Sequence, residues 1–132
     1  MLPDGRKYVD VSTNKTLTAA DAGIVQNVIA DAVVVTLPST ADGLVFTVRN
    51  GGDAPAGAPV GAGSNQSALV SVSPAAADGI TGNGYTATVN KDAQNTKATA
   101  NVGDEITLVG NGTAGVTAWT VAEVKGIWAR EA

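Results

Sequence analysis

The sequence predicts a single all-β domain, and three observations predict it. Short apolar runs rich in valine, isoleucine and threonine recur along the chain and end at glycine, proline or asparagine. The length of 132 residues suits one domain. Apolar residues make up 44% of the chain but aromatic residues only 4%, so small and β-branched side chains must form the core. We therefore expect a β-sandwich or jelly-roll-like domain of short strands over residues 16–132, preceded by an N-terminal arm over residues 1–15.

The beginning of the chain predicts two strands and one helical turn. Residues 7–12 alternate polar and apolar side chains, which predicts a strand with Tyr8 and Asp10 on the same face. Residues 18–23 can form one helical turn closed by a glycine. Residues 23–29 then follow as a second strand.

Two β-branched runs in the middle of the chain predict a hairpin. The run at residues 32–37 ends at Pro38, which cannot donate to a strand ladder. The run at residues 43–49 alternates again and ends before an Asn-Gly-Gly sequence, and we expect the two runs to pair. Residues 51–67 hold mostly glycine, alanine, proline, serine and asparagine. This composition predicts a long surface loop, which is either a contact element or a solvated connector.

The second half of the chain predicts further strands separated by turns. These strands are expected at residues 68–73, 85–89, 96–100, 103–109 and 116–124. Asn-Gly pairs at residues 83–84 and 111–112 are typical of hairpin turns. The chain has no repeat of fixed period and no heptad pattern, which disfavours solenoid and coiled-coil folds.

The residue types that are missing exclude many functions. The chain has no cysteine and no histidine, so disulfides, thiol nucleophiles, Ser-His-Asp triads and histidine-ligated metals are excluded. A net charge of −4 disfavours nucleic acid as a partner. No apolar stretch has the length of a signal peptide or of a membrane span. We expect a soluble protein that is not an enzyme, with no cofactor, no metal and no membrane partner.

Three clusters of acidic or glycine residues are better interpreted as structural elements than as catalytic, metal-binding or phosphate-binding sites. Asp104 and Glu105 are adjacent on a predicted strand, so they point to opposite faces and cannot act as a carboxylate pair. We expect them to form a solvated strand start. Residues 78–82 lack the dense carboxylates of a calcium loop, and Asp78 is expected to cap a turn. Residues 110–115 are glycine-rich but lack the lysine of a phosphate loop, which favours a hairpin end.

Three aromatic residues are the candidate anchors of the core or of an interface. They are Phe46, Trp119 and Trp128. A tryptophan buries a large area while its indole N–H requires a partner, so each tryptophan either packs in the core or contacts a partner protein. Sugar stacking is the weaker interpretation, because a lectin site usually displays several exposed aromatic side chains.

Five segments, each a strand end or a turn, form an ordered set along the chain. They lie at residues 33–38, 43–48, 78–82, 103–109 and 119–121 with 126–128. As a set, which spans residues 32–129, they resemble small virion proteins of tailed bacteriophages, above all the capsid decoration proteins, also called cement or head-stabilising proteins. The resemblance implies a β-sandwich on the outer surface of the capsid in the virion. It also implies a homotrimer, made in the host cytoplasm, that binds the major capsid protein and stabilises contacts between capsomers, without a catalytic residue.

Two other functional classes remain open at this point. A trimeric phage fibre or receptor-binding module would display exposed aromatic residues at its loop tips. An enzyme of carbohydrate chemistry would need two carboxylates that face each other across a cleft.

The N-terminal arm is the candidate capsid contact. Residues 1–15 contain three basic and two acidic side chains, although the whole chain is acidic. We expect residues 2–5 to be extended before binding, and the arm to dock by adding a strand to the capsid subunits. The candidate contact residues are Leu2, Arg6, Lys7, Tyr8 and Val9. The alternative is that this segment is simply the first strand and completes the sandwich.

Overall fold

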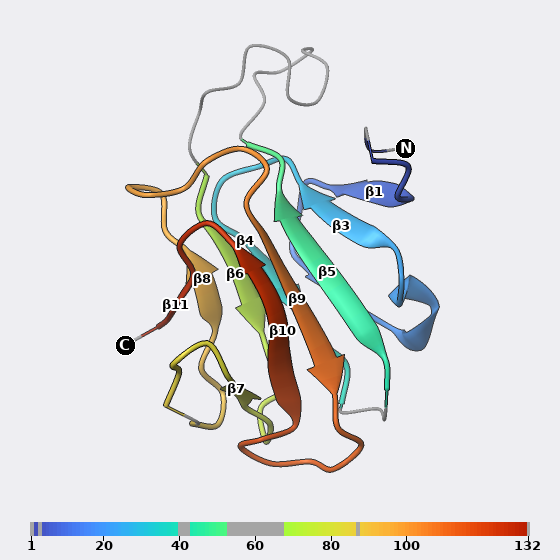
Figure 1. Ribbon diagram of the computed structural model, residues 1–132, viewed down its shortest axis with the longest axis vertical. Helices are drawn as coiled ribbons and strands as arrows, with labels where there is room; N and C mark the ends of the chain where they lie inside the picture. The colour runs from blue at the N-terminus through green and yellow to red at the C-terminus, as the bar shows by residue number, and fades with distance from the viewer. Residues whose placement is uncertain (1, 3, 40–42, 53–67, 87, 132) are drawn as a thin grey trace.

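The structure is a computed structural model that describes residue 2 and residues 4–39, 43–52, 68–86 and 88–131 (Figure 1). It contains two mixed β-sheets, and the only helical element among these residues is a single 3-10 turn, η1 (Ala19–Asp21). The expectation of an all-β fold is confirmed. The described part of the chain holds no helix with the length and apolar character needed to cross a bilayer.

Among the described residues, the larger sheet has six strands and the smaller sheet has five. Figure 1 shows the two sheets. In spatial order, the larger sheet comprises β1 (Tyr8–Val11), β3 (Val25–Val28), β5 (Val45–Asn50), β9 (Glu105–Gly110), β10 (Trp119–Lys125) and β7 (Ile80–Thr81). The smaller sheet comprises β11 (Ala129–Arg130), β8 (Ala93–Asn95), β6 (Val70–Ser73), β4 (Val33–Thr36) and β2 (Lys15–Thr16).

The first six strands alternate between the two sheets. β1, β3 and β5 are parallel neighbours in the larger sheet, and β2, β4 and β6 are parallel neighbours in the smaller one. The chain therefore passes back and forth between the sheets and adds one strand to each sheet in every pass. No sequence repeat accompanies this winding. The expected hairpin of residues 32–37 with 43–49 is wrong, because β4 and β5 lie in different sheets.

The second half of the chain follows the turn signals more closely. β9 and β10 form an antiparallel pair connected through Asn111, and the Asn83 turn is closed by an antiparallel bridge between Gly82 and Tyr85. The strand expected at residues 96–100 is wrong, because the Thr99 amide donates to the Thr96 carbonyl and closes a turn there. Of the strand expected at residues 85–89, the described residues form only isolated bridges.

One hydrophobic core receives side chains from both sheets. Most of its members are valine, leucine or isoleucine, as the composition predicts. Phe46 and Trp119 are fully buried and meet edge to face, with ring centroids 5.5 Å apart. Trp128 is also buried, and its indole N–H donates to the Lys125 carbonyl at 3.1 Å. All three aromatic anchors therefore lie in the core rather than on an exposed surface of this chain.

A buried polar network joins the two sheets at one end of the core. The Asn50 amide on β5 donates to the Asn95 side-chain oxygen on β8 at 2.7 Å, and the Asn95 amide donates to an Asp104 carboxylate oxygen at 3.1 Å. The Asn101 backbone N–H donates to the same carboxylate oxygen. Asp104 is only 4% exposed, so the expectation of a solvated strand start is wrong for this residue. A carboxylate can be buried here because these donors replace water.

Two glycines shape the surroundings of this network. Gly126 has a φ of +89°, and a Cβ at this position would lie 2.2 Å from the Asp104 carboxyl carbon. The buried carboxylate thus occupies the place where residue 126 would carry a side chain. Gly52 donates its backbone N–H to the Asn50 side-chain oxygen at 2.9 Å. Residues 53–67 of the expected long loop lie outside the described residues.

Candidate binding surface

A row of polar side chains crosses the outer face of the larger sheet. Its members are direct neighbours in the strand register, one from each of five adjacent strands. They are Asp10 on β1, Asn27 on β3, Arg49 on β5, Glu105 on β9 and Lys125 on β10. Because side chains alternate along a strand, their neighbours Val48 and Ile106 point into the core while the row points away from it.

Hydrogen bonds connect most of this row. The Asn27 side-chain amide donates to Asp10 at 3.1 Å, and Arg49 Nη1 donates to the Asn27 oxygen at 2.7 Å. Arg49 Nε lies 4.0 Å from Glu105 Oε1. Lys125 ends the row, and no described carboxylate lies within ion-pair distance of its ammonium group.

The N-terminal segment folds onto this row through Arg6. Its guanidinium donates from both Nη atoms to the two carboxylate oxygens of Glu105, at 3.0 and 2.5 Å, and from Nε to Asp4 at 2.6 Å. Such a bidentate pair is both directional and strong for a partly buried ion pair. The hydrogen bonds to Glu105 raise the pKa of Arg6 above its usual range, and the backbone N–H of Arg6 lowers the pKa of Asp4.

The segment before β1 is a closed turn. The Leu2 amide donates to the Arg6 carbonyl at 2.9 Å, and the Gly5 amide donates to the Leu2 carbonyl at 2.8 Å. Leu2 is only 9% exposed. The expectation of an extended segment over residues 2–5 is therefore wrong for the residues described, because the ion pair with Glu105 and this turn hold the segment against the sheet.

The remaining contact candidates lie on or beside β1, which is an edge strand of the larger sheet. Lys7 is exposed, Tyr8 is half-buried and Val9 is 38% exposed. Asp10 pairs with Asn27 on the outer face while Val11 reaches the core, so the expected strand is confirmed over Tyr8–Val11, although Val9 is exposed. The structure thus shows that residues 8–11 of the segment form the edge strand of the larger sheet.

The free edge of β1 offers unpaired backbone groups. The carbonyls of Lys7 and Val11 accept hydrogen bonds from the amides of Val25 and Ile29, so these carbonyls face β3. Alternate residues of a strand direct their backbone groups to opposite sides. The backbone N–H and C=O groups of Tyr8 and Asp10 therefore face away from β3, where no described strand pairs with them.

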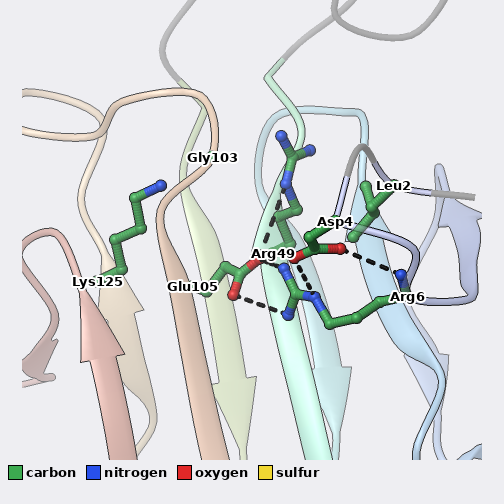
Figure 2. Close-up of a pocket in the computed structure, with 7 residues that line it drawn as sticks. All are labelled: Leu2, Asp4, Arg6, Arg49, Gly103, Glu105 and Lys125. Atoms are coloured by element: carbon green, nitrogen blue, oxygen red, sulfur yellow. Dashed lines mark hydrogen bonds and ion pairs between the residues drawn. The ribbon is translucent and has the colours of Figure 1, made fainter.

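Beside the row lies a pocket of about 220 Å³ (Figure 2). It is lined by Leu2, Asp4, Arg6, Arg49, Gly103, Glu105 and Lys125. Sequence reasoning identified Leu2 and Arg6 but missed Arg49 and Lys125. The available signal was their position as charged residues that alternate with apolar ones on predicted strands.

The other clusters keep structural roles. An Asp78 carboxylate oxygen accepts the Gly115 backbone N–H at 3.0 Å and the Asp78 amide closes a turn with Ala75, so the expected turn cap is confirmed. Within the described ranges, no three acidic side chains gather closely enough to hold a metal ion.

The Arg6–Glu105 pair predicts how firmly the N-terminal turn is held. Glu105→Gln removes one acceptor and the negative charge, so we expect the Gly5 amide to exchange with solvent about three- to tenfold faster. Hydrogen exchange followed by NMR measures this rate. Glu123→Gln is the matched control, because Glu123 is an exposed carboxylate on β10. Equal exchange rates in the wild type and in Glu105→Gln would contradict the role of the pair.

Comparison with protein-family models and with curated proteins finds no match for this chain. Function is therefore inferred from the residues and their geometry.

Proposed function

We propose that this protein is a structural virion protein that binds the outer surface of a bacteriophage head and stabilises contacts between capsomers. Its partner is the major capsid protein, and it is made in the host cytoplasm. The ordered strand and turn segments that resemble capsid decoration proteins support this proposal. So does the two-sheet architecture, which we describe as a β-sandwich. Five of the nine strand pairings among the described residues are parallel, so this sandwich differs from an antiparallel jelly roll.

The free edge of β1 is the observation that carries the proposal. The outward backbone groups of Tyr8 and Asp10 can pair with one strand of a capsid subunit, which extends the larger sheet by β-augmentation. Arg6 holds the start of this strand in place through Glu105. The edge is therefore preorganised, which lowers the entropic cost of docking.

Burial of the aromatic residues favours a decoration protein over the fibre or receptor-binding alternative. Phe46, Trp119 and Trp128 are buried, and Tyr8 and Tyr85 are half-buried. A receptor site would be expected to expose aromatic anchors. The acidic pair at the start of β9 also argues against carbohydrate chemistry, because Asp104 is buried in the core and Glu105 is bound to Arg6.

We also propose that the protein assembles as a homotrimer. Each sheet ends in short strands, β1 and β7 in the larger sheet and β2 and β11 in the smaller, and such edges are commonly covered by association. Sedimentation equilibrium should give a mass about three times 13.0 kDa. A monomer at high micromolar concentration would contradict the trimer.

Proline at position 8 tests docking at the β1 edge. Tyr8→Pro removes the outward N–H and places a ring in the path of an incoming strand, while the bonds from β1 to β3 stay intact. We expect affinity for undecorated heads to fall at least tenfold, measured by co-sedimentation with heads built from the cognate major capsid protein.

Tyr8→Ala is the matched control because it removes the side chain and keeps the N–H. It should weaken binding less than Tyr8→Pro, and both variants should melt within a few degrees of the wild type. If Tyr8→Pro binds heads as tightly as the wild type, the β1 edge is not the contact. If the wild-type protein does not bind heads at all, the proposed function itself is wrong.

A further inference from the structure

The pocket beside the polar row contains two cationic nitrogen atoms directed toward the same point. Gly103, which is labelled in Figure 2, is one of its lining residues. It is buried and has a φ of +99°. A Cβ built on Gly103 would meet Arg49 Nη2 at 3.7 Å and Lys125 Nζ at 4.0 Å, with no other described heavy atom within 4 Å outside the local chain. The two nitrogen atoms are therefore less than 8 Å apart.

Neither of these two nitrogen atoms has an anionic partner among the described residues. Arg49 uses Nη1 for Asn27, and its Nε lies 4.0 Å from Glu105. Lys125 is the register partner of Glu105, but both oxygens of Glu105 accept hydrogen bonds from Arg6. Arg6 thus occupies the Glu105 carboxylate, which would otherwise neutralise the charge of Lys125.

The charge of the pocket selects the kind of ligand. Three cationic side chains and two carboxylates line it, so it carries a local excess of one positive charge in a protein of net charge −4. A monoanion balances this excess. The separation of the Arg49 and Lys125 nitrogen atoms also fits a carboxylate. With two charge-assisted hydrogen bonds of about 2.8 Å, one carboxylate can bridge nitrogen atoms up to about 8 Å apart.

We propose that this pocket binds a single carboxylate group between Arg49 and Lys125. Gly103 makes room for the group, and Arg6 sets the charge of the pocket by engaging Glu105. The site is separate from the β1 edge and does not depend on capsid binding. Its ligand is either an acidic side chain of a partner protein or a free small carboxylate.

Titration with acetate, followed by the NMR resonance of the Gly103 amide, tests the site. We expect a saturable shift with acetate that sodium chloride at the same ionic strength does not produce. Lys125→Gln should weaken acetate binding at least fivefold, and Lys125→Arg should restore it. Lys91→Gln removes the same charge from a lysine outside the pocket and should leave acetate binding unchanged.

Further titrations show whether the ligand is a protein carboxylate or a free one, and whether the site prefers a carboxylate to phosphate. A blocked peptide with one glutamate that binds more tightly than acetate supports a protein carboxylate as the ligand, and equal binding supports a free one. The matching glutamine peptide should not bind. The proposal is wrong if the Gly103 resonance does not shift, if Lys125→Gln binds acetate like the wild type, or if inorganic phosphate binds more tightly than acetate.

Discussion

The buried hydrogen bonds that link Asn50, Asn95 and Asp104 are the constraint on which the rest of the molecule depends. They join β5 of the larger sheet to β8 of the smaller sheet and to the residue before β9. Asn50, Asn95 and Asp104 are buried beside the apolar core. An amide or carboxylate without a hydrogen-bond partner there would cost folding free energy. The hydrogen bonds of the network supply partners for these buried groups. Arg49 is the neighbour of Asn50 in the sequence, and Glu105 is the neighbour of Asp104. Because successive side chains of a strand point to opposite faces, the position of the inner network also fixes where these two members of the outer row lie.

On the outer face of the larger sheet, the charged side chains of Arg6 and Arg49 meet at Glu105. Arg49 and Glu105 are direct cross-strand partners, and Arg6 reaches the same carboxylate from the N-terminal turn. That contact holds the start of β1 on the sheet and occupies both oxygens of Glu105, and Lys125 has no described counter-ion. The proposed docking edge and the proposed carboxylate pocket are separate features, and the Arg6–Glu105 ion pair lies beside both.

Sequence reasoning predicted many local features of this fold and the hairpin turn between β9 and β10, but it missed the pairings between strands that are distant in the sequence. Local patterns identified the longer strands and the shared face of Tyr8 and Asp10, because the period of two is a local property. They missed the short strands β2, β7, β8 and β11, which have two or three residues each. They could not show which strand lies beside which, and so β4 and β5 were paired wrongly across two sheets. The pocket brings together Arg6, Arg49 and Lys125 from distant parts of the chain, which only the strand order could reveal.

The stability of Asn95→Ala tests the central role of the buried network most directly. This substitution removes the acceptor of the Asn50 amide and a donor to Asp104, so urea unfolding should show a loss of about 3 kcal/mol or more. Gln94→Ala, at the half-buried neighbouring residue on β8, should cost no more than about 1 kcal/mol. If Asn95→Ala proves no more destabilising than Gln94→Ala, the network does not hold the two sheets together.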